Sequence, residues 1–463
     1  MTETATTPTD TQQPVLIIGG GMAGLSCAFR LVTAGVPIRL LESSEHLGGR
    51  VRTRMRDGLP IDDGFQVLFR AYPETRRLMD DVGFDDGLIR PYDRGAICYD
   101  YGAPFTFSAN PLDVARFRLM TPADKARLGA LGAIMLKTST ADIWNDPHDE
   151  TTEAYLRRFG FSIGAIERFF RPFFAGIFLN PALDTSSKDF RFIFKMLASG
   201  ETVTTRDGLG AIPQAIAAAI RARGGLIDTG VHAATIVPPE GTRSPMVEVK
   251  HPDGREERIH GSAVVIAATA PEARRLLEPL DSPVARRIPT VGLPSTTVAW
   301  RLPRSLYPEK KILLNIDAVA GKRRMETGFH LAAQITNITH PDGTGGTGHL
   351  LIGVSVAEAC ADPSYRENML PGEVLATLGK WFPHANVAQD AELVDVHHTA
   401  FGQFAQPPGT REQLPSNHTR FPSIVVAGEY TESSSIEGAV VSGTRAAELV
   451  RVAHARRPAT ITP

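Results

Sequence analysis

Cysteine is scarce in this chain of 463 residues, which contains only Cys27, Cys98 and Cys360. Three widely spaced cysteines form neither a disulfide framework nor a paired metal-binding motif. Excess charge is also lacking, because 49 basic and 51 acidic residues give a formal net charge of −2. That balance gives no electrostatic reason to expect binding to nucleic acid, and the composition excludes a disordered or fibrous chain.

Long apolar runs and targeting signals are missing as well. No run reaches the length of about 18 apolar residues that a membrane-spanning helix needs. Residues 1–13 are polar and rich in threonine, without the basic and apolar regions of a secretory signal, so we expect a disordered tail. These features predict a cytoplasmic protein, and they leave a peripheral membrane contact open.

The clearest pattern lies in residues 15–42. An apolar run at 15–18 is followed at once by Gly19-x-Gly21-x-x-Gly24, then by apolar residues at helical spacing, and then by a second apolar run ending at Glu42. This strand, turn, helix and strand form the dinucleotide-binding fingerprint, in which the glycines allow a tight turn and close approach of a pyrophosphate. The helix N-terminus offers free N–H groups at Met22 and Ala23, and Glu42 is placed to accept hydrogen bonds from ribose hydroxyls.

Two further segments carry chemistry. Residues 42–50 read ESSEHLGGR, and two glycines followed by Arg50 suit a diphosphate that approaches the backbone. Near the C-terminus, an apolar run at 424–427 precedes Gly428 and Glu429, and the segment SIEGAVVSG at 435–443 opens a helix. The positive end of that helix suits the carbonyl edge of a reduced flavin. Between these segments, the sequence predicts strands at 229–237 and 246–250.

The segments 42–50, 61–73 and 425–443 resemble the FAD-dependent superfamily of flavin amine oxidases, protoporphyrinogen oxidases and carotenoid desaturases. The motifs are most similar to those of plant-type phytoene and ζ-carotene desaturases. Two residues depart from that pattern, since Gln66 replaces a frequent histidine and Arg70 a frequent glycine. The resemblance implies an α/β fold with a discontinuous Rossmann-like FAD-binding domain (14–75, 205–290 and 395–463) and an inserted α+β substrate domain (76–204 and 291–394).

The resemblance also implies FAD as cofactor and assigns residues to it, with Tyr72 lining the substrate site and no residue assigned a catalytic or metal-binding role. The residues expected to bind FAD are Gly19, Gly21, Met22, Ala23, Gly24, Glu42, Ser43, Gly49, Arg50, Gln66, Val67, Val231, Gly428, Glu429, Ile436, Glu437, Gly438 and Ala439.

The activity implied is removal of hydride from a hydrophobic small molecule, with desaturation of an isoprenoid or polyene favoured and oxygen or a quinone as electron acceptor. A flavin amine oxidase and a non-catalytic FAD-binding protein are the alternatives. Ser435 stands where amine oxidases commonly place an aromatic residue, which weakens the first alternative. The phenylalanine-rich stretch 168–179 has two interpretations: core packing, or a pocket for a long apolar substrate near a membrane surface.

Overall fold

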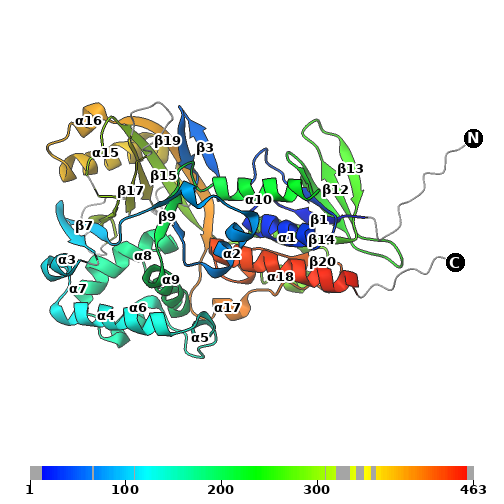
Figure 1. The fold of residues 1–463 in the computed structure, drawn as a ribbon, viewed down its shortest axis with the longest axis horizontal. Coiled ribbons are helices and arrows are strands. Elements are labelled where there is room, and N and C mark those ends of the chain that lie inside the picture. The colour runs from blue at the N-terminus through cyan, green and yellow to red at the C-terminus, as the bar shows by residue number, and fades with distance from the viewer. Residues whose placement is uncertain are drawn as a thin grey trace, which may run out of the picture.

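The computed structural model describes residues 13–455 except 65–66, 109, 308, 320–333, 340–348 and 356–360, and between 320 and 360 only the backbone of two strands. Residues 1–12 of the predicted tail and Gln66 therefore lie outside the described part. Figure 1 shows two regions side by side, one holding β1 and α18, the first and last described elements, and the other a second sheet above a layer of helices.

The first region is built on a parallel sheet in the order β10-β2-β1-β14-β20. The strands are β1 (Val15–Ile18), β2 (Ile38–Leu41), β10 (Leu226–Asp228), β14 (Ala263–Ile266) and β20 (Ile424–Val426). β1 is an unbroken apolar run because both faces of the sheet are covered. Val15 and Ile17 pack with helical side chains, whereas Leu16 and Ile18 pack on the opposite side.

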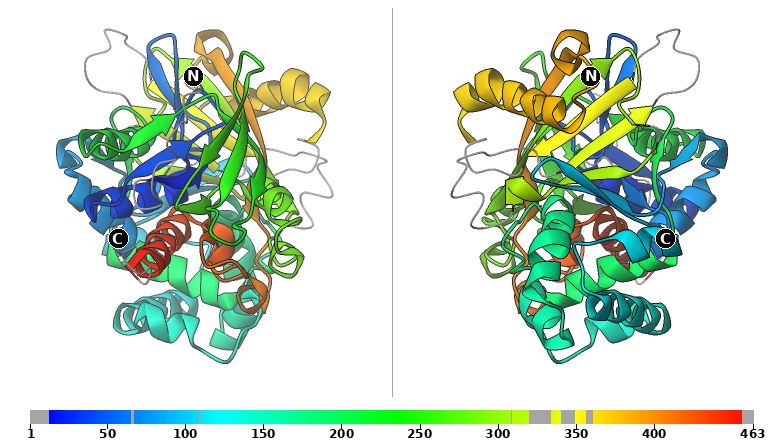
Figure 2. Two further views of the ribbon diagram at one scale, coloured as in Figure 1. Left: turned by 90° about the vertical axis from the view of Figure 1, so that its right-hand side faces the viewer. Right: turned by 90° about the vertical axis from the view of Figure 1, so that its left-hand side faces the viewer.

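Helices cover one face of this sheet and a small antiparallel sheet covers the other (Figures 1 and 2). The helices are α1 (Met22–Thr33), α2 (Pro73–Val82), α10 (Ala211–Ala222) and α18 (Ile436–Ala455). The small sheet holds β11 (His232–Val237), β12 (Met246–Lys250) and β13 (Glu256–His260), and its Val247, Val249 and Ile259 pack against Leu16 and Ile18. Helices α11 (Ala270–Leu277) and α12 (Ser282–Ala285) follow β14. This arrangement confirms the α/β fold with a Rossmann-like parallel sheet.

One predicted strand boundary is wrong. The apolar pattern at 229–237 predicts one strand, but the structure has β10 before it and β11 only from His232. Gly230 lies between them with φ of 71°, a left-handed conformation that breaks an extended strand. The break lets the chain leave the parallel sheet at Asp228 and enter the small sheet.

The second region contains a mixed sheet in the order β19-β15-β18-β17-β16-β7-β8. Its strands are β7 (Ala96–Asp100), β8 (Ala103–Phe107), β15 (Gly292–Leu302), β16 (Ile312–Asn315), β17 (Gln334–Thr339), β18 (His349–Ser355) and β19 (Glu392–Phe404). The helices α13 (Ile316–Val319), α15 (Leu370–Trp381) and α16 (Val387–Asp390), with a π-helical turn at Tyr365–Met369, belong to the same part of the chain. Tyr99 stacks on Trp381 at 4.0 Å between ring centroids, which joins α15 to the sheet.

A layer of helices lies beside this sheet (Figure 1). It comprises α3 (Pro111–Arg116), α4 (Pro122–Lys137), α5 (Thr140–Trp144), α6 (Thr152–Phe159), α7 (Ile163–Ala165), a π-helical turn (Ile166–Phe170), α8 (Arg171–Phe178) and α9 (Ser187–Ser199). Polar caps start several of them, such as Thr121 and Asp124 in a capping box at α4. Phe169, Phe170 and Phe174 are buried in this layer.

Short elements connect the two regions. They are β3 (Thr53–Arg56) paired with β4 (Leu59–Asp62), and β9 (Thr202–Thr205) paired with β5 (Leu68–Phe69) and β6 (Ile89–Pro91). Two 3₁₀ turns (Asp86–Leu88 and Glu429–Thr431) and α17 (Thr410–Gln413) complete the described elements. We propose the domain limits 14–75, 205–290 and 395–463 for the FAD-binding domain and 76–204 and 291–394 for the inserted domain, although β19 stays in the second sheet as far as Phe404.

Candidate cofactor and substrate cavities

The carboxyl ends of the parallel strands meet at one edge of the first sheet. The residues that follow β1, β2, β14 and β20 all line one cavity there, which we call the cofactor cavity. Ligands of open α/β sheets bind at this edge, where strand ends and helix N-termini converge. The edge is therefore the place expected for a dinucleotide.

The glycine turn after β1 shapes the floor of this cavity. Gly19 has φ of 109°, and a Cβ built on it would lie 2.5 Å from the carbonyl oxygen of Ala267. A Cβ on Gly24 would lie only 1.9 Å from the carbonyl oxygen of Gly19, because α1 packs directly on the turn. A Cβ on Gly21 would meet nothing within 4 Å. Two glycines thus serve packing, and Gly21 leaves open space.

The N-terminus of α1 points free donors at that space. Gly21 is the N-cap residue, and no side chain in the described part of the chain caps the helix. Met22 and Ala23, which line the cavity, begin the first turn, whose N–H groups have no partner within the helix. Free N–H groups and the positive end of the helix dipole favour an anion such as a pyrophosphate.

Glu42 lies across the turn at the end of β2. Its Oε2 accepts a hydrogen bond from the backbone N–H of Gly20 at 2.6 Å, and its Oε1 accepts from the N–H of Ser44 at 2.8 Å. These bonds fix the carboxylate at the cavity wall, with lone pairs left for ribose hydroxyls. Val231 lies beside it, because its N–H donates to the backbone oxygen of Glu42 at 2.8 Å.

Arg50 and Glu429 form an ion pair between the two ends of the chain. One guanidinium nitrogen of Arg50 donates to Glu429 Oε2, and the other donates to the backbone oxygen of Gly402 at 2.8 Å. The second carboxylate oxygen of Glu429, Oε1, is buried and has no hydrogen-bond partner among the residues that the structure describes. Since a buried charged oxygen is rarely left unpaired, it marks a place for a ligand donor such as a ribityl hydroxyl.

The structure places most of the predicted FAD-binding residues together. Those that line the cofactor cavity are Gly19, Gly21, Met22, Ala23, Glu42, Ser43, Gly49, Arg50, Val231, Gly428, Glu429, Ile436 and Ala439. Val67 and Tyr72 line an adjoining cavity instead. Gly24, Glu437 and Gly438 line neither cavity, and Gln66 lies outside the described residues.

The side chain of Glu437 is directed away from the cofactor cavity. Its carboxylate accepts hydrogen bonds from the N–H groups of Glu74 and Thr75 at 2.9 Å and from the Thr75 hydroxyl at 2.7 Å. It therefore caps the first turn of α2, while burial raises its pKa. Glu437 could therefore contact a flavin only through its backbone, at the start of α18.

The adjoining cavity, which we call the substrate cavity, shares Arg50, Ser435 and Ile436 with the cofactor cavity. Its space amounts to about 1110 Å³ with the open mouth included. Its apolar wall is formed by Val67, Phe69, Tyr72, Ile177, Phe178, Leu179, Phe192 and Ile193. The ring of Tyr72 stacks on that of Phe192, with 5.9 Å between the centroids. Burial, together with the nearby Glu437 carboxylate, raises the pKa of Tyr72, so the Tyr72 hydroxyl stays neutral.

Core packing holds for part of the phenylalanine-rich stretch, and its use by a long apolar substrate stays a proposal. Phe169, Phe170 and Phe174 are core residues, whereas Ile177 and Phe178 face the substrate cavity. Five polar side chains of this cavity were not predicted from the sequence. They carry no motif, and only folding brings them to one cavity: Asp189, Ser295, Thr399, Gln403 and Gln406.

The cofactor cavity fits FAD in three respects. It offers free helix N–H groups for a pyrophosphate, fixed carboxylate oxygens for hydroxyls, and the unpaired Glu429 Oε1. The residues that line the two cavities, within the described part of the chain, include no lysine.

Replacing Glu42 with glutamine tests its assignment. The amide keeps one acceptor oxygen but loses the charge that holds the N–H groups of Gly20 and Ser44, so we expect about 10-fold weaker FAD binding. Isothermal titration of the apoprotein with FAD measures the change. Glu278→Gln, at the end of α11 outside the cavity, serves as control and should bind FAD normally. If wild type and Glu42→Gln bound FAD with equal affinity, Glu42 would not be an FAD-binding residue.

Comparisons with known proteins agree with this geometry. The model of the family "flavin containing amine oxidoreductase" matches residues 22–451. Protoporphyrinogen oxidase 2 of Arabidopsis thaliana is 25% identical over 164 residues, covering 35% of this chain and 32% of its own length. A ζ-carotene desaturase of Zea mays is 41% identical over 76 residues, covering 16% of this chain and 13% of its own. The chain thus matches only parts of these curated relatives.

A solved structure shows the same fold along almost the whole chain. An oxidoreductase from Methanosarcina mazei superposes with a TM-score of 0.69 at 18% identity, covering 94% of this chain and 100% of the other.

Proposed function

The chain belongs to the flavin-containing amine oxidoreductase family, is an oxidoreductase and binds FAD, and from this premise we propose that it desaturates an isoprenoid or polyene. The observation that supports this proposal is the substrate cavity. It opens onto the cofactor cavity at Arg50, Ser435 and Ile436, and more of its surface is apolar than polar. Such a wall stabilises a long apolar molecule and excludes water from the reacting bond.

Each protein group has a defined task in this proposal. The α1 N-terminus, Glu42 and Glu429 bind the cofactor, and the Arg50–Glu429 pair fixes the junction between the two cavities. Tyr72 and Phe192 orient the substrate by stacking, because a conjugated chain presents a flat face to them. When bound, FAD supplies the acceptor for the two electrons and two hydrogens that leave the substrate as a double bond forms. Oxygen or a quinone then takes up these electrons.

A panel of substrates tests the proposal. The purified holoprotein is mixed without oxygen with a polyene such as phytoene, a porphyrinogen, and a primary amine, and flavin absorbance is followed. We expect phytoene to bleach the flavin bands and to gain a double bond, which mass spectrometry detects as a loss of 2 Da. Bleaching by the amine alone would select amine oxidation, and bleaching by the porphyrinogen alone would select porphyrinogen oxidation. A flavin that all three leave oxidised would favour a non-catalytic FAD-binding protein.

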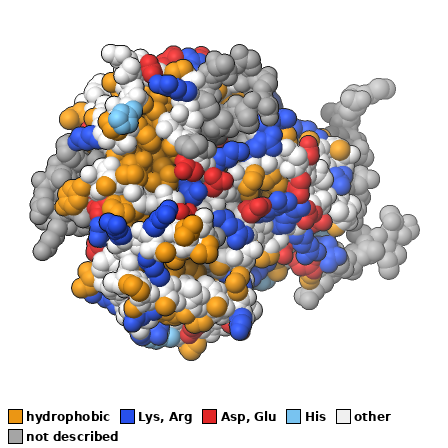
Figure 3. Space-filling model, turned by 60° about the vertical axis from the view of Figure 1, so that its left-hand side comes forward, with side chains coloured by type: hydrophobic (Ala, Val, Ile, Leu, Met, Phe, Trp, Pro, Cys, Tyr) orange, Lys and Arg blue, Asp and Glu red, His pale blue; other side chains and the backbone are white. Residues whose placement is uncertain are grey.

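A peripheral membrane contact is part of the same proposal. No helix among the described residues combines the length and the apolar character that crossing a bilayer requires. Exposed Leu112, Ile134, Leu136 and Ile163 lie on α3, α4 and α7 of the helical layer. Figure 3 shows apolar side chains gathered on one face of the molecule, with basic and some acidic side chains around them, and apolar and basic groups together suit a lipid surface.

A further inference from the structure

The substrate cavity has a buried polar corner beside its apolar wall. We define the polar corner as Asp189 in α9, Gln406 after β19 and Ser434 before α18. Each of these residues is at most 8% exposed. On the same helix, Phe192 and Ile193 continue the apolar wall. A hydrocarbon that filled this cavity would leave the corner facing carbon atoms.

Backbone contacts hold the corner together. The carbonyl oxygen of Gln406 accepts a hydrogen bond from the N–H of Ser186 at 2.7 Å, at the N-terminus of α9. The side-chain oxygen of Gln406 accepts from the N–H of Ser434 at 2.8 Å, next to the junction with the cofactor cavity. Gln406 thereby ties Asp189's helix to the segment that borders the flavin site.

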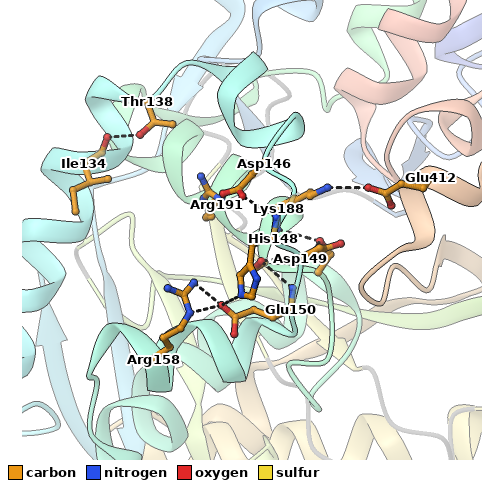
Figure 4. A network of polar contacts seen from close by, with 12 residues as sticks. Ile134, Thr138, Asp146, His148, Asp149, Glu150, Arg158, Lys188, Arg191 and Glu412 are labelled. Carbon is orange, nitrogen blue, oxygen red and sulfur yellow. Dashed lines mark hydrogen bonds and ion pairs between the residues drawn. The ribbon is translucent and has the colours of Figure 1, made fainter.

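Asp189 forms no ion pair among the described residues, although Arg411 and Lys188 attract its charge from nearby. No hydrogen bond or ion pair joins its carboxylate to another side chain in the described part of the chain. The charged groups around it are Lys188, Arg411 and Asp149. Lys188 Nζ donates to Glu412 at 2.8 Å, as Figure 4 shows. Arg411 pairs with Glu432 at 2.9 Å.

The third neighbour is also engaged elsewhere. Asp149 accepts from the Ser186 hydroxyl at 2.6 Å and from the N–H of Gly409 at 3.0 Å. Burial raises the pKa of Asp189 to about 7, with Asp149 adding to the rise while Arg411 and Lys188 oppose it. Its carboxyl therefore lines the cavity with unused acceptor capacity, and a donor supplied by a ligand would lower the cost of burying it.

We propose that the polar corner recognises a hydrogen-bond-donating group, a hydroxyl or an ammonium, on an otherwise apolar substrate. Asp189 accepts this bond, and the apolar wall takes the remaining chain. Anchoring one end of a long molecule fixes how far it reaches toward Arg50, Ser435 and Ile436, and hence which bond lies at the flavin. Asp189 is thus a specificity-determining residue. This inference rests on the proposed function, and it predicts that a polyene with a hydroxyl or ammonium group binds more tightly than a plain hydrocarbon such as phytoene, which the cavity still accepts.

Ligand binding to the holoprotein tests the proposal without turnover. The probes are 1-dodecanol, its methyl ether and dodecylamine, which share a chain and differ in the donor group. Their dissociation constants are read from shifts of the flavin absorption bands. We expect wild type to bind the alcohol about 3- to 10-fold, and the ammonium about 10- to 100-fold, more tightly than the ether.

Three variants separate the outcomes. Asp189→Leu should remove both preferences, and Asp189→Asn, which keeps an acceptor oxygen, should keep part of the alcohol preference and lose that for the ammonium. Asp207→Asn removes an exposed carboxylate that lines neither cavity and should behave as wild type. If Asp189→Leu fails to fold, Asp189→Asn alone tests the proposal. Loss of its preference for the ammonium probe supports the proposal, and retention of that preference contradicts it.

Two results would overturn the inference: equal binding of all three probes by wild type, or unchanged donor preferences in the Asp189 variants. Failure of the proposed function looks different. In that case no polyene would reduce the flavin, with or without a hydroxyl, while the donor preference of wild type and its loss in Asp189→Leu would persist.

Discussion

Gly24→Ala should unfold or severely destabilise the FAD-binding region, whereas Gly21→Ala should leave its stability unchanged and abolish FAD retention. At Gly24 the new methyl group would lie 1.9 Å from the backbone oxygen of Gly19 and 3.3 Å from the Ala267 side chain. The turn cannot give way, because the N–H of Gly19 is bonded to Leu41 at 2.8 Å. Overpacking of this kind costs about 3 kcal/mol or more.

At Gly21 the same substitution meets no protein atom within 4 Å, and φ of −75° suits alanine. The methyl group projects into the cofactor cavity, where it would take the space of the bound pyrophosphate. We therefore expect normal thermal stability of the apoprotein and at least about 100-fold weaker FAD binding, since a clash at a close backbone approach is not relieved by a flexible side chain.

Thermal unfolding of the apoproteins and titration with FAD measure both effects. Gly129→Ala is the matched control, because Gly129 lies inside α4 with open space around its Cα and should gain about 0.5–1 kcal/mol of stability. Tight FAD binding by Gly21→Ala would show that the pyrophosphate does not bind at this turn. A stable Gly24→Ala protein would show that α1 can move away from β1.

Arg50→Ala should release FAD and destabilise the apoprotein. The Glu429 carboxylate is 7% exposed and, among the described residues, pairs with Arg50 alone, so the substitution leaves a buried negative charge uncompensated. Breaking such a pair costs about 3–5 kcal/mol when both groups are buried, and about 2 kcal/mol is expected here because the Arg50 side chain is 24% exposed. FAD binding should fall by at least about 100-fold, as a positive charge at the cavity wall is lost.

The double variant Arg50→Met/Glu429→Gln separates stability from binding. It removes both charges, so we expect much of the lost thermal stability to return while FAD binding stays weak. The absorbance ratio of flavin to protein after gel filtration measures retention. If Arg50→Ala retained FAD fully, or if the double variant regained it, the ion pair would be a structural element only.

Local sequence determined the element order around the cofactor cavity. The turn from β1 to α1 and Glu42 after β2 follow from contiguous residues, since glycine positions and apolar periodicity act within a few residues. The closing segment is similar, because Gly428 follows an apolar strand and α18 begins at Ile436. Motifs of this kind can be read without knowing what packs against them. The strand predicted at 229–237 failed because Gly230 breaks it, and the apolar pattern does not show where the chain changes sheets.

Only the tertiary structure decided where the polar side chains point. Glu437 lies in a recognisable motif, yet its carboxylate caps α2 through bonds that span 362 residues of sequence. Arg50 and Glu429, 379 residues apart, meet because β20 joins the same sheet as β1 through β14. Asp189 and Gln406 carry no motif at all. The physical reason is that strand order and helix packing set long-range contacts, whereas sequence patterns report which face of an element is apolar and not which distant residue it will meet.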